Sequence, residues 1–258
     1  LERGNALLFG MRQASPPELQ YGGAQQRDVA VHTAMTTDIF LQARLGSTRL
    51  SGKALMQICG KSVIELIVER LRRISGIHQI VIVTGSQEKN AALAEEAARL
   101  GVPCFFGSED NLLDRFYRAG REFGSDAIVR VTGDCPLIDP QLIVEGTRLF
   151  REKGCDILTN ARVRSYPDGL DFEIFTRSAL ERAWMKRGGE GANPVTPMLK
   201  DRDFRAEDMV RTPSLAHIRI TLDYPEDIQV IKEIYGNVYE KNSQFSLEDI
   251  VQFLSSRP

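Results

Sequence analysis

The stretch DIFLQARLGSTRLSGKAL, residues Asp38–Leu55, decides the fold class, because an apolar run passes directly into a loop of different character. The run 39–41 has the composition of a buried strand. The loop behind it holds two glycines, three hydroxyls and three cations: Gly46, Gly52, Ser47, Thr48, Ser51, Arg44, Arg49 and Lys53. Glycine lets the backbone approach an anion, and free N–H groups can bind phosphate oxygens. The stretch therefore predicts a strand followed by an anion-binding loop.

This loop contains neither GxxxxGK[ST] nor GxGxxG, the two common phosphate-binding motifs. Taken alone, it fits a flexible basic turn at the end of a sheet about as well. Its position directly after a strand favours binding, because ligands of open α/β sheets lie outside the carboxyl ends of the strands. We expect Arg44, as a planar fork, and Lys53, as a point charge, to neutralise phosphate.

Strand-like and helix-like segments alternate from Asp38 to about residue 160. The run 78–85 is continuously apolar, which is typical of a strand buried on both faces. The segment 61–74 carries an apolar stripe at helical spacing. Further strands are expected at 103–107, 126–133 and 155–160, and further helices at 89–101, 109–124 and 140–154. This order predicts an α/β fold with a mainly parallel sheet sandwiched by helices.

Two segments depart from this alternation. Residues 1–36 show little periodicity, so we expect a non-core N-terminal extension, with Met35 as a natural start. We expect residues 37–258 to form a single domain. Its segment of about 161–209 is rich in Gly, Pro and charge and is expected to form an insertion or lid over the sheet. A strand at 217–223 and helices at 225–236 and 246–254 should follow.

The bulk composition excludes several classes of function. The net charge is −2, so there is no basic excess of the kind that nucleic-acid binding requires. No apolar run approaches the roughly 20 residues of a membrane span, so we expect no membrane insertion. The 4 cysteines are scattered without a CxxC pair, which indicates neither a zinc site nor a disulfide framework. We therefore expect reduced thiols and a cytoplasmic protein.

Carboxylates follow several of the predicted strands. Asp134 comes after the strand at 126–133, and Asp168 and Asp171 come after the strand at 155–160. Cations from one strand end and carboxylates from others would meet at one edge of the sheet, which suits a polyanionic substrate with a divalent metal. Asp134 and Asp168 could instead be turn residues that bond their own backbone and bind no ligand. Spacing alone favours Asp223 as a helix N-cap, because Pro225 follows it.

A series of motifs resembles those of the sugar cytidylyltransferases. LQARLGSTRLSGKAL is similar to the ARxxSTRLPGK-like run of CMP-Kdo and CMP-sialic acid synthetases. VTGDCPLIDP, YPDGLDFEIF, PVTP and ITLDYPEDI resemble more narrowly the spore coat polysaccharide biosynthesis protein F group. The resemblance spans about residue 38 to the end and implies the Rossmann-like fold of nucleotide-diphospho-sugar transferases.

The resemblance implies transfer of CMP from CTP to a sugar acid or sugar phosphate, with release of pyrophosphate, for polysaccharide or surface glycan synthesis. It assigns Asp134 and Asp223 to Mg²⁺, which makes Asp223 more than a cap. It places Asp168, Asp171 and Glu173 near the sugar. The catalytic residues would be Arg44, Lys53 and Asp134. The nucleotide-binding residues would be Leu41, Gln42, Ala43, Arg44, Gly46, Ser47, Lys53 and Thr132.

The chain departs from the family pattern at two places. Ser51 stands where the family usually has proline, and Ala192-Asn193-Pro194 stands where the spore coat group usually has Arg-Glu-His. The second departure leaves an alternative open: a catalytically altered nucleotide-sugar-binding protein, or a partner subunit in polysaccharide assembly. A nucleotide other than CTP is a further alternative. Fold-level analogy alone suggests a homodimer, with the segment after Ala161 as a contact surface.

Overall fold

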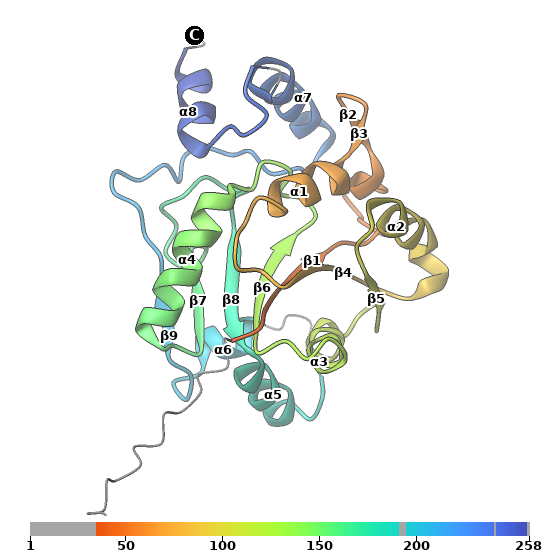
Figure 1. Cartoon of the computed structure of the whole chain (residues 1–258), viewed down its shortest axis with the longest axis vertical. Coiled ribbons are helices and arrows are strands. Elements are labelled where there is room, and N and C mark those ends of the chain that lie inside the picture. The colour runs from red at the N-terminus through yellow and green to blue at the C-terminus, as the bar shows by residue number, and fades with distance from the viewer. Residues whose placement is uncertain (1–34, 191–194, 240, 257–258) are drawn as a thin grey trace, which may run out of the picture. The chain divides into compact units, whose positions relative to one another are not determined.

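A seven-stranded sheet forms the centre of the computed structural model, which describes residues 35–190, 195–239 and 241–256 (Figure 1). The strand order is β5-β4-β1-β6-β8-β7-β9. All neighbours pair in parallel except β8, which is antiparallel to β6 and β7. The prediction of a mainly parallel sheet is confirmed. The strands are β1 (Thr37–Gln42), β4 (Gln79–Thr84), β5 (Cys104–Phe106), β6 (Ala127–Thr132), β7 (Ile157–Thr159), β8 (Phe172–Thr176) and β9 (Ala206–Asp208).

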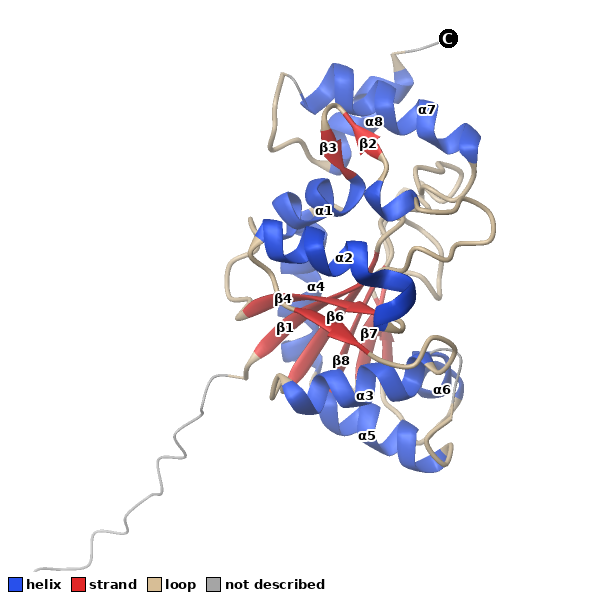
Figure 2. Ribbon diagram, turned by 90° about the vertical axis from the view of Figure 1, so that its right-hand side faces the viewer, coloured by secondary structure: helices blue, strands red, loops and turns tan. Residues whose placement is uncertain are grey.

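Alternation along β1 sends its side chains into two separate cores. Ile39 and Leu41 face one core, and Phe40 faces the other. Both faces are therefore buried, which explains why the strands have continuous apolar runs. Figure 2 shows helices on both sides of the sheet. The first core takes side chains from α1 (Val63–Leu71), α2 (Gln87–Leu100) and α4 (Pro140–Lys153), and the second from α3 (Leu112–Glu122), α5 (Arg177–Lys186) and α6 (Val195–Lys200).

The C-terminal elements brace the loop that follows β6. These elements are α7 (Pro225–Ile234), a π-helical turn (Tyr235–Tyr239) and α8 (Leu247–Ser255). The Tyr235 hydroxyl donates to the Pro136 carbonyl at 2.7 Å. Asp139 caps α4 and also accepts from the Leu247 N–H at 2.7 Å. The buried Arg70 Nε donates to the Ile138 carbonyl at 2.6 Å. These bonds hold residues 136–139 in place, and these residues belong to the loop that carries Asp134.

The segment expected to lie over the sheet contributes to the sheet itself. Its strand β8 inserts between β6 and β7, and its strand β9 forms the edge beyond β7. The expectation of a lid at 161–209 is therefore corrected, because these two strands complete the sheet. The strand expected at 217–223 is also absent from the described residues. That segment makes one isolated bridge, between Arg219 and Asp168.

Three short elements come after the loop that leaves β1: a 3₁₀ turn (Lys53–Leu55), β2 (Gln57–Ile58) and β3 (Lys61–Ser62). The extension expected at 1–36 lies outside the described residues up to position 34. Within the part of the chain that the structure describes, no helix has the length and apolar character needed to cross a membrane.

Candidate active site

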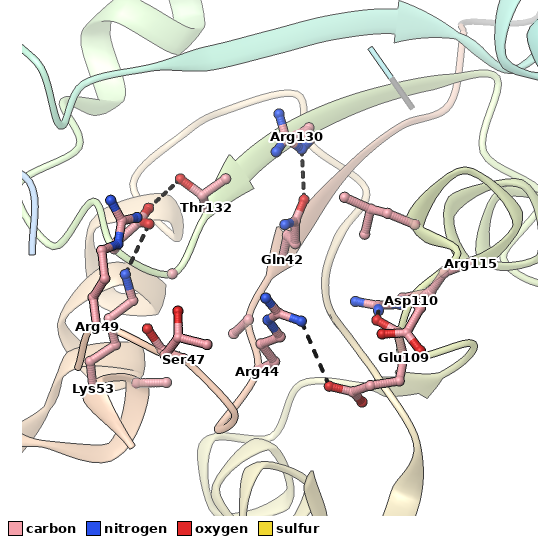
Figure 3. Close-up of a pocket in the computed structure, with 16 residues that line it drawn as sticks. Gln42, Arg44, Ser47, Arg49, Lys53, Glu109, Asp110, Arg115, Arg130 and Thr132 are labelled. Carbon is pink, nitrogen blue, oxygen red and sulfur yellow. Dashed lines mark hydrogen bonds and ion pairs between the residues drawn. The ribbon is translucent and has the colours of Figure 1, made fainter. Parts of the chain in front are cut away.

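A cavity of about 490 Å³ opens at the carboxyl ends of β1 and β6 (Figure 3). Three segments line it: the loop after β1, the β5–α3 loop with the start of α3, and the end of β6. The lining residues are Gln42, Ala43, Arg44, Ser47, Thr48, Arg49, Lys53, Ala54, Glu109, Asp110, Leu112, Arg115, Arg130, Thr132, Gly133 and Asp134. Seven of the residues predicted for the nucleotide or for catalysis are among them: Gln42, Ala43, Arg44, Ser47, Lys53, Thr132 and Asp134.

Hydrogen bonds to α2 and to the loop after β6 hold the end of β1 and the loop after it in place. The Leu45 N–H donates to Asn90 Oδ1 at 2.9 Å, which ties the loop to the start of α2. The Gly133 N–H donates to the Gln42 carbonyl at 2.8 Å. A Cβ at Gly133 would lie 3.0 Å from the Ala43 Cβ, so glycine permits this close approach. The loop therefore presents its cations between the ends of β4 and β6.

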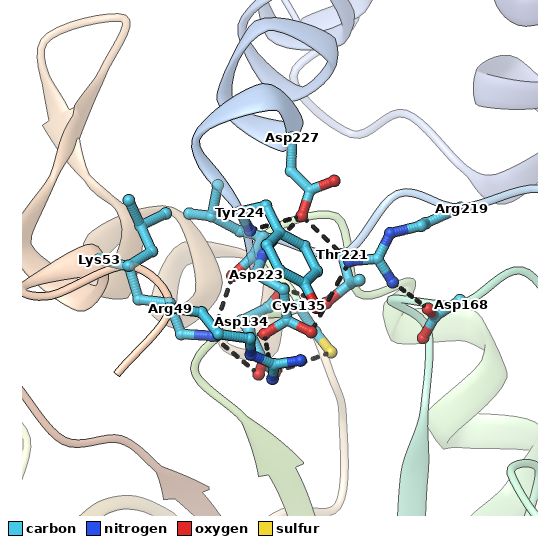
Figure 4. A network of polar contacts seen from close by, with 12 residues as sticks. Arg49, Lys53, Asp134, Cys135, Asp168, Arg219, Thr221, Asp223, Tyr224 and Asp227 are labelled. Atoms are coloured by element: carbon cyan, nitrogen blue, oxygen red, sulfur yellow. Dashed lines mark hydrogen bonds and ion pairs between the residues drawn. The ribbon is translucent and has the colours of Figure 1, made fainter. Parts of the chain in front are cut away.

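Lys53 bridges two carboxylates that are far apart in the sequence (Figure 4). Its Nζ donates to Asp134 Oδ2 at 3.0 Å, to Asp223 Oδ1 at 2.9 Å and to the Leu222 carbonyl at 2.9 Å. The Lys53 and Asp223 side chains are only 12% and 14% exposed. Lys53 therefore brings the loop after β1, the loop after β6 and the segment before α7 to one point.

Asp134 is an ionised carboxylate at the edge of the cavity. Burial opposes its ionisation, but the positive charge of Lys53 and hydrogen bonds from Thr132 and Lys53 outweigh it, so its pKa lies below the ordinary value. The Thr132 hydroxyl donates to Asp134 Oδ1 at 2.5 Å. The neighbouring Cys135 thiol is buried, and burial raises its pKa well above the usual range. This thiol is therefore protonated and is no nucleophile.

The structure separates the two roles that the sequence left open for Asp223. The Asp227 carboxylate accepts from the N–H groups of Asp223 at 2.7 Å and Tyr224 at 2.9 Å. Asp227 thus caps α7, and the expectation from spacing that Asp223 is the cap is wrong. The Leu222 N–H donates to the Asp134 carbonyl at 2.8 Å, which sets Asp223 beside Asp134. The Asp223 carboxylate faces Lys53 and Arg49, and Arg219 Nη2 lies 3.7 Å from its Oδ2.

The oxygens around Lys53 Nζ suit a divalent cation. Two carboxylate oxygens and one carbonyl oxygen surround this single position, and hard cations prefer oxygen ligands. Among residues 35–190, 195–239 and 241–256, no group of three or more His, Cys, Asp or Glu side chains could hold a metal. A cation here would take its remaining ligands from phosphate and water, as Mg²⁺ usually does. The donor set fits that role.

The predicted sugar-side carboxylates lie outside the residues that line the cavity, and each faces an arginine. Arg219 Nη1 donates to Asp168 Oδ2 at 2.5 Å. Arg164 Nη1 lies 3.2 Å from Asp171 Oδ2. Burial is the main cause that raises the pKa of Asp171 to about 6, and the charges of Asp168 and Glu173 add to it. Asp171 is therefore partly protonated near pH 6 and mostly ionised at neutral pH.

Glu173 pairs with Arg130 in a buried contact between β6 and β8. The two residues are opposite in the register, and Arg130 Nη1 donates to Glu173 Oε2 at 2.8 Å. Arg130 Nε donates to Gln42 Oε1 at 2.8 Å. Arg130, and not Glu173, lines the cavity. Sequence reasoning missed Arg130, although a charge inside the apolar run AIVRV was a signal.

Sequence reasoning also missed the third wall of the cavity, which comes from the β5–α3 loop. Glu109 Oε2 accepts from the Ser86 N–H at 3.0 Å, and Oε1 lies 3.9 Å from Arg44 Nη1. A Cβ at Gly85 would lie 1.7 Å from Glu109 Oε2, so only glycine allows this contact. Arg115 bonds the carbonyls of Ser108 and Glu109. The position of Glu109 in the loop after β5, at the same sheet edge as the other strand ends, was the signal for it.

Three predicted positions need separate mention. Leu41 is fully buried, so only its main chain could meet a ligand. Gly46 lies in the loop between the cavity-lining residues Arg44 and Ser47 but does not itself line the cavity. The Ala192-Asn193-Pro194 departure lies outside the described residues.

Comparison with known proteins identifies the family of this chain. A family model described as "Cytidylyltransferase" matches residues 39–242. An uncharacterized protein of Methanocaldococcus jannaschii is 30% identical, covering 84% of this chain and 90% of that protein. The spore coat polysaccharide biosynthesis protein SpsF of Bacillus subtilis is 27% identical over 84% of this chain and 93% of its own length. A cytidylyltransferase structure from Leptospira borgpetersenii has a TM-score of 0.79 at 29% identity and covers 86% of this chain and 94% of its own.

Proposed function

The chain belongs to the cytidylyltransferase family, and we propose that it transfers CMP from CTP to a sugar acid or sugar phosphate for polysaccharide or surface glycan synthesis. One observation carries the proposal. Lys53 of the cationic loop and Asp134 after β6 line one cavity, and Lys53 also contacts Asp223, which lies before α7 and outside the cavity lining. Cations and carboxylates in this arrangement suit phosphoryl chemistry on a nucleoside triphosphate.

In the proposed reaction, an oxygen of the sugar attacks the α-phosphorus of CTP. The new P–O bond forms as the bond from the α-phosphorus to the bridging oxygen breaks, and pyrophosphate leaves with the electron pair. A hydroxyl acceptor also gives up its proton to solvent water, whereas an ionised phosphate acceptor has none to lose. Because the protein forms no covalent bond, its contribution is positioning and electrostatic stabilisation.

The loop after β1 would bind the nucleotide. We assign the main chain of Leu41, Gln42 and Ala43 to the base, and Arg44 to the phosphates. Arg44 is half exposed, and its contact with Glu109 is long at 3.9 Å, so its guanidinium is available to a ligand. Gly46, Ser47 and Thr132 are assigned to the nucleotide as well.

We assign the metal to Asp134 and Asp223, with Mg²⁺ as the expected ion. A divalent cation bound there would polarise the phosphoryl oxygens as a Lewis acid. The chain's own part is to keep Asp134 ionised and to hold the two carboxyl groups adjacent. Hydrogen bonds from Lys53 and Thr132 do this for Asp134, and capping by Asp227 leaves the Asp223 carboxylate free.

We assign the acceptor to the side of the site that carries β8. Asp168 and Asp171 precede β8, and their arginine partners Arg219 and Arg164 are 40% and 49% exposed. Exposed guanidinium groups can bind carboxylate or phosphate as planar forks. This side therefore suits a sugar that carries an anionic group, with Asp168, Asp171 and Glu173 orienting the arginines.

Pyrophosphate release tests the proposal directly. The purified chain would be incubated with Mg²⁺, each of the four nucleoside triphosphates, and a panel of sugar acids and sugar phosphates. We expect release with CTP and one class of acceptor, and loss of release in Asp134→Asn.

Two other outcomes have different meanings. CTP binding without turnover on any acceptor would favour a catalytically altered nucleotide-sugar-binding protein. Turnover with a nucleotide other than CTP would keep the chemistry and overturn the base assignment.

A further inference from the structure

We propose that Lys53 has two successive roles: it occupies the cation position between Asp134 and Asp223 before ligands bind, and it then moves to the triphosphate. The proposal rests on the proposed function, because it takes these carboxylates as the metal site. In this scheme the ammonium group is a substitute cation. The chain thereby couples the binding of metal to the binding of nucleotide.

The contacts of Lys53 Nζ support the first role. An ammonium group has three N–H donors. Here all three are used, on Asp134 Oδ2, Asp223 Oδ1 and the Leu222 carbonyl, at 2.9 to 3.0 Å (Figure 4). These oxygens are also the set that a divalent cation would use. One nitrogen therefore stands at the position that the metal requires, and the two cannot bind there together.

Charge explains why a substitute is needed. Asp134 and Asp223 would repel each other if no cation lay between them, and both are largely shielded from water, at 27% and 14% exposure of their side chains. With Lys53 in place, one positive charge lies between the two carboxyl groups and holds them adjacent. The carboxylate pair is thus held in advance of metal binding.

The properties of lysine suit the second role. Its ammonium lies at the end of a flexible four-carbon stem and can move without a change in the backbone. Lys53 begins a short 3₁₀ turn, and its side chain also lines the cavity with Arg44 and Arg49. A triphosphate in this cavity offers the ammonium new oxygen partners. Its departure from the carboxylates makes room for a metal.

Arg49 provides a matched comparison. Its Nη2 donates to Asp223 Oδ1 at 3.0 Å, the same oxygen that Lys53 contacts. The structure gives Arg49 no hydrogen bond or ion pair with Asp134 among the described residues, and its side chain is 51% exposed. Both residues carry one positive charge near the pair, but only Lys53 lies between the carboxylates. Variants of the two residues therefore show whether the effect comes from a group that occupies the position between the carboxylates or only from a nearby positive charge.

The test is Mn²⁺ binding without nucleotide, measured by electron paramagnetic resonance of the free ion. We expect weak binding by the unsubstituted chain. Lys53→Met should tighten it at least about fivefold, the lower end of typical coupling between sites. Arg49→Met should tighten it clearly less. Equal tightening in the two variants, or none in Lys53→Met, would overturn the proposal.

A double variant separates this inference from the proposed function. Adding Asp134→Asn to Lys53→Met should abolish the gain in Mn²⁺ affinity. If the tight binding survives, the ion lies elsewhere, and the metal assignment fails along with the inference. If Mn²⁺ binds through Asp134 in the unsubstituted chain as tightly as in Lys53→Met, only the inference fails.

A measurement on the unsubstituted chain covers the case in which Lys53→Met does not fold. Lysine acetylation followed by peptide mass spectrometry reports how accessible each ammonium group is. Lys53 should react slowly without ligands and faster with saturating Mn²⁺, whereas the exposed Lys89 should react equally in both. No increase at Lys53 would show that it stays between the carboxylates, which contradicts the proposal.

Discussion

Two groups of carboxylates near the same edge of the sheet hold their cations in different ways. In the first group, Asp134 and Asp223 share one lysine, Lys53, at 3.0 and 2.9 Å, and Arg49 is bonded to Asp223 alone, at 3.0 Å. Lysine is a point charge on a flexible stem, so its ammonium group can be replaced by another cation without a change in the backbone. We therefore propose that the first group binds a metal that arrives and leaves with the nucleotide.

In the second group, Asp168, Asp171 and Glu173 each face an arginine. The Arg130 guanidinium is bonded on two sides, to Glu173 and Gln42, which fixes the orientation of its plane. A planar fork held in this way can orient a substrate, but it cannot be exchanged readily. Under the proposed function, we assign the chemistry to the first group and substrate orientation to the second.

The largest effect that this comparison predicts is the loss of turnover in Asp134→Asn. Removing one charge from the metal pair should lower the rate of pyrophosphate release by about a hundredfold to a thousandfold, in line with the loss of one strong electrostatic contact to a transition state. Steady-state assays of pyrophosphate release would measure it.

The control for this prediction is Asp227→Asn, in the same cluster but in a capping role. It should cost about 1 kcal/mol of stability and leave turnover near that of the unsubstituted chain. If both variants lost turnover equally, the proposed division between a metal ligand and a cap would be wrong.

The second prediction concerns Glu173→Gln, which breaks the buried pair in the second group. Arg130 would remain buried without its counter-charge, which costs roughly 3 to 5 kcal/mol in the free energy of unfolding. Urea denaturation would measure the loss. The double variant Arg130→Met with Glu173→Leu removes both charges and should be less destabilised than Glu173→Gln. Unchanged stability with a raised KM for the acceptor would instead indicate that Glu173 binds the sugar directly.

The third prediction is a raised KM for CTP in Arg44→Met. A hydrogen bond to a charged group contributes about 1.5 to 3 kcal/mol, so KM should rise roughly tenfold to a hundredfold. Stability should change little, because the Arg44 side chain is 50% exposed. Arg118→Met on α3 removes an equal charge from an exposed side chain and serves as the control. A similar rise in KM in both variants would show that Arg44 acts on CTP through its long-range charge and does not contact the phosphates.

The first half of the fold could be predicted well because its signals are local. Continuous apolar runs and helical stripes alternate from β1 to α4, and each can be recognised within a short window. The place of β8 cannot be recognised in that way. It depends on pairing with β6, for example Arg130 opposite Glu173, across 43 positions of sequence.

The strand predicted at 217–223 is wrong for a related physical reason. The segment alternates like a strand, but its N–H groups bond separate points of the chain: Ile220 donates to the Asp168 carbonyl, and Leu222 to the Asp134 carbonyl. No continuous ladder forms among these described residues. The same bonds place Asp223 at the site, so its position could be inferred from the motif but not from local pattern.

The smallest predicted effect concerns Asp171 and depends on pH. Its pKa in the folded chain is about 6, above the ordinary value of 3.8, chiefly because of burial. The folded chain therefore holds this proton more tightly, and the stability that it contributes is present below the ordinary pKa and is lost as pH rises through 6.

Asp171→Asn removes the buried charge, so the variant should be more stable than the unsubstituted chain at pH 8, by about 1 to 3 kcal/mol, and should differ less at pH 5. Urea denaturation at the two pH values would measure this. Asp201→Asn is the control of opposite sign, because a hydrogen bond from Lys186 lowers the pKa of Asp201. If Asp171→Asn were less stable at pH 8, the ion pair with Arg164 would outweigh burial. In that case the main effect of Asp171 would be to stabilise the fold through its ion pair, as Glu173 does with Arg130. Greater stability with slower turnover would instead show that Asp171 is retained for the substrate.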